Sequence, residues 1–398
     1  MSAGEIGFWL VAGGGALFRL RAAQRIAEVL SPRWRLLPAG IDTASPPVRV
    51  SVCIPARDEA AVIDRVLASL DVQDHADTEV IVCDDRSTDG TGALANAHRC
   101  RVIEGSDPPG GWLGKQWALQ TASGAATGDI LCFADADTWH HPAALRTCAA
   151  EMERDQLDVL VVVGGQALGT WSERLVMPMF WTALLSFLDI KRAEAPERPN
   201  DAMGNGQFWL VRRAAYDRIG GHERVKDRLA EDVAIVRALK ADGARYRLRF
   251  GPTLTATRMY TGFGSLWHGF QKNAAVVDPA QPVLSAGLTI VAVILLVQAE
   301  LWPWMALALA PTVGGLWAHP VTILLAAAQA GALIHGRASL YRVVCDAASG
   351  APLSRYPWLY LAQPLGAIIG MAAILNSMQA QLRGATRWKG RRVRGKSL

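Results

Sequence analysis

Cysteine is sparse in this chain of 398 residues, which contains only six. The six form no Cys-x-x-Cys pair and no cluster with histidine, so they argue against a scaffold held together by disulfides. Three of them, Cys53, Cys83 and Cys132, fall inside predicted strands, where cysteine behaves as a small buried apolar residue. This usage is compatible with a reducing compartment.

Acidic residues are almost absent from the last third of the chain. From Pro279 to the end only Glu300 and Asp346 are acidic, and leucine, alanine, valine, isoleucine, tryptophan and glycine dominate. The net charge of +5 therefore comes largely from arginines beside apolar segments and from a basic tail. That pattern is typical of the cytoplasmic face of a membrane. No aromatic-rich binding module accompanies the tail, so we expect no nucleic-acid partner.

Apolar segments in this region predict transmembrane helices over residues 279–380, followed by a basic cytoplasmic tail over 381–398. The segments are 283–299, 302–318, 320–335 and 358–376. Two or four crossings would return the tail to the cytoplasm, but the arginines of the 336–357 loop fit such a topology poorly, so the number of spans stays open. A buried all-helical domain is the alternative.

The amino-terminal segment 6–20 is also apolar and is followed, rather than preceded, by arginines. It shows no small-residue cleavage site, so we predict a membrane anchor at 1–25 and not a cleaved signal peptide. Under the positive-inside rule the amino end faces outward and the next domain lies in the cytoplasm. We therefore expect a multi-pass protein of a bacterial-type inner or plasma membrane.

Residues 45–278 have the charges, turns and short apolar runs of a soluble domain. Predicted strands alternate with predicted helices, which indicates an α/β fold with a mostly parallel sheet and crossover helices. The strands are expected at 48–54, 79–83, 101–104 and 129–134, and the helices at 60–70, at 115–126 and from Pro142.

Two of these strands run into paired acidic residues. Asp84 and Asp85 follow one strand, whereas Asp135 and Asp137 follow another with i, i+2 spacing, which puts both side chains on one side of an extended chain. Because parallel strands end at one edge of the sheet, we expect these acids to converge there. Clustered carboxylates need protons or a cation to compensate them, and they suit Mg2+ or Mn2+. A solvated surface turn is the alternative reading.

A glycine-rich turn, Gly110-Gly-Trp-Leu-Gly-Lys115, precedes a predicted helix. It is not a P-loop, because Gln116 stands where that motif needs serine or threonine. Such a turn at a helix amino terminus still suits an anionic diphosphate, and a plain loop is the alternative. Further along, Glu231 and Asp232 open an amphipathic helix, a place where acids usually complement the helix dipole.

Several motifs together carry a family resemblance. In order they are Pro55-Ala-Arg-Asp-Glu59, Asp84-Asp-Arg-Ser-Thr-Asp-Gly-Thr91, Gly114-Lys115, Asp135-Ala-Asp137 and Glu231-Asp232. As an ordered set over about residues 48–275, they resemble inverting family 2 glycosyltransferases with the Rossmann-like GT-A fold. Other motifs resemble the membrane-bound branch associated with carotenoid and hopanoid glycosylation, namely Gly111-Trp-Leu-Gly-Lys-Gln-Trp117, Met203-Gly-Asn-Gly-Gln207, Gly220-Gly-His222, Gly269-Phe-Gln-Lys-Asn273 and Trp388-Lys-Gly-Arg391.

The resemblance implies a role for each site residue. Residues that would contact the nucleotide sugar are Asp58, Asp85, Lys115 and Asp135. Of these, Asp85 would hydrogen-bond uracil, Lys115 would lie near the diphosphate or the donor sugar, and Asp135 would contact ribose or sugar. Asp137 would ligate the divalent metal, and Asp232 would be the general base.

The acceptor side of the site is marked by a departure from the family pattern. Processive and glycolipid-forming relatives carry a Gln/Arg-x-x-Arg-Trp motif before the membrane segment, and residues 266–273 lack it. This absence disfavours a polysaccharide synthase. Candidate residues for the acceptor region are Gln207, His268 and Lys272.

These observations predict a membrane-bound, metal-dependent enzyme. It would transfer a sugar, with inversion, from a nucleoside diphosphate sugar such as a UDP-sugar to a polyisoprenoid or other lipid acceptor. The apolar region supports a lipid acceptor, since a soluble acceptor does not need it. The alternatives are a processive polysaccharide synthase, a non-catalytic membrane scaffold, and a nucleotidyltransferase that makes the activated sugar.

Overall fold

The computed structural model describes residues 2–40, 48–273, 281–383, 387–388 and 391–392. The chain divides into two compact units. The first, here called the sheet unit, contains Pro32–Ala167 and Ile190–Met259. The second, here called the helical unit, contains the amino-terminal segment to Ser31, the segment Leu168–Asp189 and the chain from Tyr260 to Arg387.

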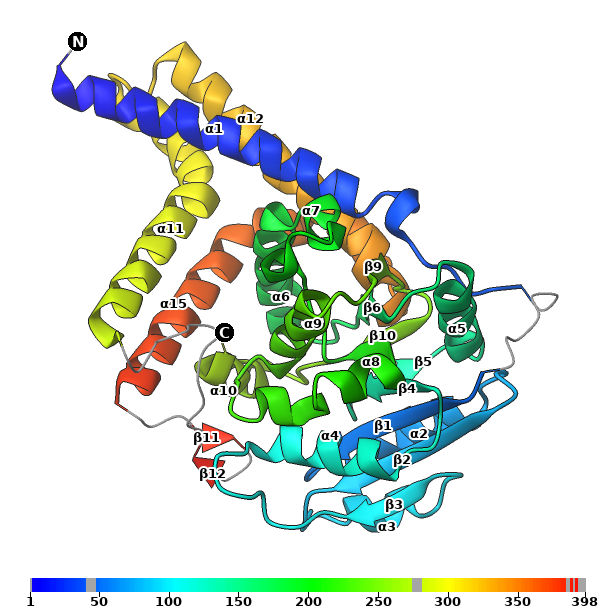
Figure 1. The fold of residues 1–398 in the computed structure, drawn as a ribbon. Helices are drawn as coiled ribbons and strands as arrows, with labels where there is room; N and C mark the ends of the chain where they lie inside the picture. Colours follow the sequence, from blue (N-terminus) through cyan, green and yellow to red (C-terminus); the bar gives the residue numbers. More distant parts are fainter. Residues whose placement is uncertain (1, 41–47, 274–280, 384–386, 389–390, 393–398) are drawn as a thin grey trace. The chain divides into compact units, whose positions relative to one another are not determined.

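The sheet unit is built around a seven-stranded sheet in the order β3-β2-β1-β4-β8-β6-β9 (Figure 1). Its strands are β1 Val50–Ala56, β2 Thr78–Asp84, β3 Arg101–Glu104, β4 Ile130–Ala134, β6 Val159–Val163, β8 Phe208–Arg212 and β9 Tyr246–Phe250. Neighbouring strands are parallel except that β8 is antiparallel to both β4 and β6. The predicted α/β fold with a mostly parallel sheet is confirmed.

The helices of this unit follow the apolar spacing of the sequence. They are α2 Ile63–Asp71, α3 Thr91–Ala95, α4 Gly114–Ala125, α5 Ala144–Arg154, α7 Ile190–Glu194, α8 Arg213–Arg218 and α9 Glu231–Ala241, with 3-10 turns η1 Pro32–Trp34, η2 Pro199–Asp201 and η3 Gly221–Val225. The predicted helix start at Pro142 is wrong by two residues. Pro142 lies in the preceding turn, where its carbonyl accepts a hydrogen bond from the Asp74 amide.

The main core of the sheet unit lies on one face of the large sheet. Alternate residues of the strands, such as Val52 and Ile54 of β1, point to that face and are fully buried. Helices α2 and α5 cover them with Ile63, Leu67 and Leu145 among others. Each such side chain contributes about 1.5–3 kcal/mol by burial, so the face that supports the strand ends is rigid.

A small second sheet fixes the chain just after β4. It contains β5 Thr138–His140, β7 Gly165–Gln166 and β10 Thr255–Thr257, with β10 antiparallel to β5 and parallel to β7. The Thr257 hydroxyl donates to the Asp137 carbonyl at 3.1 Å. The backbone that carries Asp137 is therefore anchored at the edge of the large sheet.

The helical unit contains most of the apolar segments. Its elements are α1 Ala3–Val29, α6 Trp171–Phe187, α10 Phe263–Asn273, α11 Pro282–Val313, α12 Pro320–Leu340, a π-helical turn Tyr341–Cys345, α13 Asp346–Ser349, a 3-10 turn Leu353–Arg355, α14 Pro357–Leu361 and α15 Gln363–Leu382. Among the residues that the structure describes, three stretches are long and apolar enough to cross a membrane: Pro282–Val313, Pro320–Ser349 and Gln363–Leu382.

The helical unit differs from the predicted segmentation in two ways. Helix α11 joins the apolar segments 283–299 and 302–318, because Pro303 and Pro311 lie inside it without ending it. The predicted 336–357 loop is largely helical. Arg337 of that stretch is buried in α12, and its Nη2 lies 3.1 Å from Glu300 Oε2.

Arg19 of α1 completes this buried charge cluster, with its Nη2 3.0 Å from Glu300 Oε1. We call Arg19, Glu300 and Arg337 the Glu300 triad. It joins α1, α11 and α12 within the helical unit. The predicted basic tail falls largely outside the described residues, although Arg387–Trp388 (β11) and Arg391–Arg392 (β12) pair as short strands.

Candidate active site

The candidate site lies where β1, β2 and β4 end. The register pairs Ala56 at the end of β1 with Asp84 at the end of β2. Because β8 runs the opposite way, its first residue, Phe208, pairs with Ala134 at the end of β4. The loops after the parallel strands and the loop before β8 therefore share one edge, the usual ligand-binding edge of open α/β sheets.

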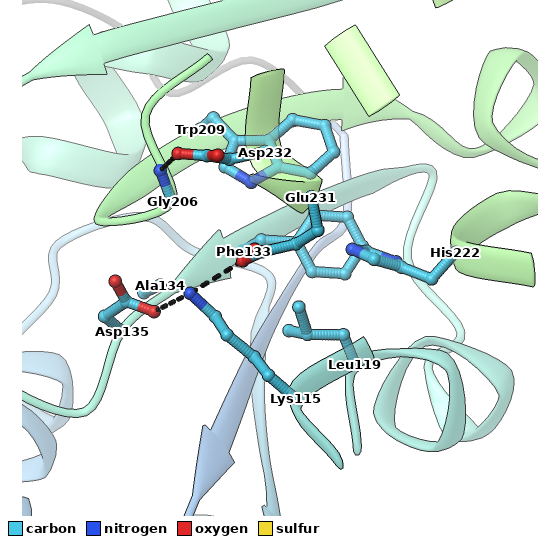
Figure 2. Close-up of a pocket in the computed structure, with 10 residues that line it drawn as sticks. All are labelled: Lys115, Leu119, Phe133, Ala134, Asp135, Gly206, Trp209, His222, Glu231 and Asp232. Atoms are coloured by element: carbon cyan, nitrogen blue, oxygen red, sulfur yellow. Dashed lines mark hydrogen bonds and ion pairs between the residues drawn. The ribbon is translucent and has the colours of Figure 1, made fainter. Parts of the chain in front are cut away.

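Lys115 links the acidic residues of this edge. It lies in the first turn of α4, and its Nζ is 2.7 Å from Asp135 Oδ1 and 2.8 Å from Glu231 Oε1 (Figure 2). Burial alone would lower the pKa of Lys115, but Asp135 and Glu231 raise it well above its usual value. Lys115 therefore stays protonated and offsets the charge of two carboxylates.

Asp232 is held by two backbone amides. The Gly206 amide donates to its Oδ2 at 2.8 Å, and the Val233 amide donates to its Oδ1 at 2.9 Å. Burial, and then the neighbouring Glu231, raise the pKa of Asp232 to about 6, although Lys115 and the amides act in the opposite direction. A carboxylate with a fixed direction and a pKa near neutrality suits general base catalysis.

Asp137 carries a buried oxygen without a partner. Its Oδ1 accepts no hydrogen bond. Burial, followed by the charges of Asp135 and Glu59, raises the pKa of Asp137 to about 7. An uncompensated buried carboxylate oxygen is what a hard cation would satisfy.

No group of three or more histidine, cysteine or acidic side chains placed to hold a metal occurs among the described residues. Mg2+ is commonly bound by one or two protein carboxylates together with substrate phosphates. Asp137 therefore fits a divalent cation that takes its remaining ligands from a diphosphate and water.

Asp58 and Asp85 lie on the two loops that follow β1 and β2. Asp58 ties these loops together, because its amide donates to Ser87 Oγ at 2.9 Å and its Oδ1 accepts from the Thr88 amide at 2.8 Å. Asp85 is buried, and its Oδ2 is 3.3 Å from Arg57 Nη1. Burial raises the pKa of Asp85, while Arg57 works against that shift.

Two glycines allow the loop before β8 to pack against the start of α9. A Cβ on Gly206 would lie 3.1 Å from Lys115 Nζ and 3.5 Å from Asp232 Oδ2. A Cβ on Gly204 would collide with the backbone of Asp232. Between them, Asn205 Nδ2 donates to the Val162 carbonyl at 3.1 Å and fixes the loop to β6. A side chain at position 206 would therefore crowd Lys115, next to the amide that donates to Asp232.

An aromatic wall backs the charged groups. Phe133 and Trp209 pair across β4 and β8 and stack with ring centroids 4.7 Å apart. His222 lies edge-on to Phe133 at 4.9 Å, and its Nδ1 is 2.7 Å from the Tyr216 hydroxyl. Burial lowers the pKa of His222 to about 3, so it is neutral at physiological pH.

Ten residues line the pocket drawn in Figure 2: Lys115, Leu119, Phe133, Ala134, Asp135, Gly206, Trp209, His222, Glu231 and Asp232. Lys115 reaches across the pocket between Asp135 and Glu231 (Figure 2).

The predicted site residues thus fall into three groups. Lys115, Asp135 and Asp232 lie in the pocket, while Asp58 and Asp85 occupy the adjoining loops and Asp137 follows β4. Gln207 is buried beside them, since its carbonyl accepts from the Asp135 amide at 3.4 Å.

His268 and Lys272 belong to α10 in the helical unit. The exposed His268 shares a 2.7 Å hydrogen bond between its Nδ1 and the Gly264 carbonyl. The side chain of Lys272 lies outside the described part of the chain. Placement of both residues near an acceptor stays a prediction.

Seven pocket residues had no role assigned from the sequence: Leu119, Phe133, Ala134, Gly206, Trp209, His222 and Glu231. The glycines at 204 and 206 are one local signal, because paired glycines mark a close backbone approach. Trp209 and Phe133 are ordinary strand residues until the β4–β8 register brings them together. Glu231 looks like a helix-dipole complement until Lys115 is placed beside it.

Residues 51–220 match the family described as Glycosyl transferase family 2. Over this segment, which is less than half of its length, the chain is similar to family 2 glycosyltransferases. This match runs from β1 through β8 and includes the acidic turns and the loop before β8, whereas Glu231, Asp232, β9 and β10 lie beyond its end.

The chain is also similar to the 4,4'-diaponeurosporenoate glycosyltransferase of Staphylococcus aureus strain MRSA252, to which it is 26% identical over 233 residues. The alignment covers 56% of this chain and 60% of the relative, so the chain spans less than two thirds of the relative's length.

Two solved structures are also similar. A mannosyltransferase from Pyrobaculum calidifontis, in complex with GDP-Man and Mn2+, is 20% identical with a TM-score of 0.48 and coverage of 95% and 97% of the two chains. TarS from S. aureus, in complex with UDP-GlcNAc, is 16% identical with a TM-score of 0.42 and coverage of 84% and 92%.

Proposed function

We propose that this glycosyltransferase moves a sugar, with inversion, from a UDP-sugar to a polyisoprenoid lipid in a metal-dependent reaction. The observation that carries the proposal is that Asp137 and Asp232, two acids of the same site, have different surroundings. Asp137 has a buried oxygen without a partner, while Asp232 is aimed by two amides and has a pKa of about 6. Asp137 is thus suited to bind a cation, and Asp232 is suited to accept a proton.

The donor would occupy the edge formed by the loops after β1, β2 and β4. Asp85 would accept a hydrogen bond from uracil, and Asp58 would lie beside the nucleotide. Asp135 would contact ribose or sugar hydroxyls. Lys115 would turn from its carboxylate partners toward the incoming diphosphate, which offers a stronger concentration of negative charge.

The transfer would proceed by a single in-line displacement. The acceptor hydroxyl oxygen forms a bond to the anomeric carbon as its proton passes to Asp232. The bond between that carbon and the diphosphate oxygen breaks, and its electron pair leaves with the nucleoside diphosphate. Attack opposite the leaving group inverts the configuration. Asp232 is needed because a neutral hydroxyl is a weak nucleophile.

A divalent cation held by Asp137 would supply charge neutralisation to the leaving diphosphate. Such a leaving group cannot gather charge easily in a pocket that already contains the carboxylates of Asp135, Glu231 and Asp232. Burial, followed by the charges of Asp135 and Glu59, raises the pKa of Asp137 to about 7. The residues present therefore fit a Mg2+ or Mn2+ ion.

The three apolar helices support a membrane location and a lipid acceptor. The name of the S. aureus relative, which refers to a carotenoid-type molecule, supports a polyisoprenoid. We propose that the sheet unit lies on the cytoplasmic side, where nucleotide sugars and a reducing environment occur. The buried cysteines of β1, β2 and β4 are consistent with that compartment.

Membranes that contain the protein provide the direct test. They would be incubated with labelled nucleotide sugars and extracted lipids, with EDTA and Mn2+ as paired conditions. The expected product partitions into organic solvent, forms only with added cation and carries one sugar. Long products would indicate a processive synthase, release of free diphosphate would indicate a nucleotidyltransferase, and no binding of any nucleotide sugar would indicate a scaffold.

A further inference from the structure

An open apolar groove runs along the helical unit. It is formed by α6, α10, α11 and α15 and has a volume of about 410 Å³. Helix α11 contributes Ser285, Leu288, Thr289, Ala292 and Leu296, whose spacing places them on one face of that helix. Eleven residues of helix separate the first from the last, so the groove follows α11 for about 16 Å.

The base of the groove is firm, and its mouth is open. Beneath it, Met179, Val293, Ala367 and Met371 form a buried apolar cluster. At its side Leu288 is 61% exposed, so a ligand can enter laterally. Helix α15 packs against α6, α10 and α11, which holds the walls of the groove together.

A glycine lets α15 pack closely against α6 at the wall of the groove. A Cβ placed on Gly370 would lie 2.8 Å from the sulfur of Met179, so any larger residue must displace that side chain. Ile374, one turn further along α15, continues the same wall.

The two ends of the groove differ in polarity. Ser285 and Thr289 lie in the first two turns of α11, and their hydroxyls donate to carbonyls of Gln281 and Ser285, each at 2.9 Å. The remaining lining residues are apolar, and none of the ten is charged. The groove therefore fits a chain of hydrocarbon with a neutral polar end, whereas the phosphate of a phospholipid would meet no cation in the lining.

We propose that this groove holds the hydrocarbon chain of a neutral lipid alcohol, the acceptor, with its hydroxyl end toward Ser285. This inference rests on the proposed function. It adds where the hydrocarbon chain of the acceptor binds and that the acceptor is uncharged. Two of the four helices, α11 and α15, are long and apolar enough to cross a membrane, so the groove opens where hydrocarbon is the surrounding solvent. A hydrocarbon chain that enters the groove replaces mobile contacts with lipid by contacts with ordered side chains.

The first test fills the groove in the full-length protein in membranes. Ala292→Trp and Gly370→Leu are compared with Ile294→Trp, a control on the exposed face of α11 whose native side chain is 60% exposed. Acceptors are a long-chain polyisoprenol and a short, water-soluble prenyl alcohol. We expect the filled variants to raise KM for the long acceptor about tenfold or more, because a few buried methylenes account for such a factor.

Transfer to the short alcohol and donor binding should match the control in the same variants. Equal KM values for the long acceptor in filled and control variants would overturn the proposal. The proposed function fails separately, if the unmodified protein transfers sugar to no lipid alcohol at all.

A second measurement uses the unmodified protein, so it does not require that any variant folds. A polyisoprenol with a photoreactive group at the end of its chain is irradiated with the unmodified protein, and the adducts are mapped. We expect adducts near Leu296 and Ile374 that excess unlabelled polyisoprenol removes and excess phosphatidylglycerol does not. Adducts elsewhere, or competition by the phospholipid, would show that the acceptor chain does not occupy this groove.

Discussion

Asp232 combines two properties that rarely coincide in a surface acid: a fixed direction and a pKa near 6. A general base works only when deprotonated. We therefore predict that kcat/KM falls about tenfold per pH unit below pH 6 and levels off above it. Asp232→Asn should lower kcat by about 100-fold to 10,000-fold while leaving nucleotide-sugar affinity unchanged. Near-normal turnover of this variant would exclude Asp232 as the base.

Lys115 sets the pKa of its neighbours, and this effect can be measured. Its charge lowers the pKa of Asp232, so Lys115→Gln should move the acid limb of the pH profile upward by about one unit. The surface change Arg218→Gln, which removes an exposed partner of Asp242, serves as the control and should leave the limb in place. A loss of rate without this displacement would mean that Lys115 acts on the donor alone.

Asp137 should govern both cation binding and acid stability. Burial raises its folded pKa to about 7, above the value in an unfolded chain, so without a cation its contribution to stability is present at low pH and is lost as pH rises through 7. Asp137→Asn should remove that loss, bind Mn2+ at least tenfold more weakly by titration calorimetry and abolish transfer. A variant that binds Mn2+ normally would place the cation elsewhere.

At the residue scale, the sequence identified acids by their position after strands. Asp85, Asp135 and Asp137 were predictable because parallel strands end at one edge. The contribution of Glu231 was not predictable, because its ion pair with Lys115 joins positions from different helices. An acid in a first helical turn looks the same whether it caps a dipole or neutralises a lysine.

Among the elements, the antiparallel β8 is the one that completes the site. Its direction brings the loop before it to the same edge as the ends of the parallel strands, so a backbone amide can reach Asp232. Strand positions were predictable from short apolar runs between turns. The place of β8 between β4 and β6 was not, because local pattern carries no information about long-range pairing.

The loop before β8 offers a prediction at this scale. Gly206→Ala would place a methyl group 3.1 Å from Lys115 Nζ and displace the amide that aims Asp232. We expect at least a tenfold loss of kcat with little change in the fold, measured by transfer rate and circular dichroism. Gly124→Ala is the matched control, because a Cβ there meets no atom within 4 Å. Equal activities of the two variants would rule out a positioning role for the loop.

The helix boundaries in the helical unit could not be predicted from composition alone. Proline usually ends a helix, which favoured separate segments around Pro303. Tertiary contacts override that tendency in α11, as they often do in apolar helices whose neighbours satisfy the freed backbone groups. The sequence likewise placed Arg337 in a loop, because its partner, Glu300, lies on another helix.

On the scale of the whole molecule, the Glu300 triad is a buried cluster of charges that links three helices of the helical unit. All three side chains are at most 5% exposed. We predict that Glu300→Ala lowers the free energy of unfolding by about 3–5 kcal/mol, because it leaves two buried guanidinium groups uncompensated. Thermal unfolding in detergent measures this effect. The exposed Glu28→Ala, which removes a surface partner of Arg25, should change stability by no more than about 0.5 kcal/mol.

The triad also dictates an order of events during synthesis. Arg19 and Glu300 are 281 residues apart in the sequence. At typical elongation rates of 5–20 residues per second, roughly 14–56 seconds pass between the making of the guanidinium and the making of its carboxylate. Throughout that interval the first helix must be sheltered by the insertion machinery or by lipid headgroups. Helix α1 is thus locked in place only after Glu300 of α11 has been made, and ribosome stalling before residue 300 should leave nascent chains that are open to degradation.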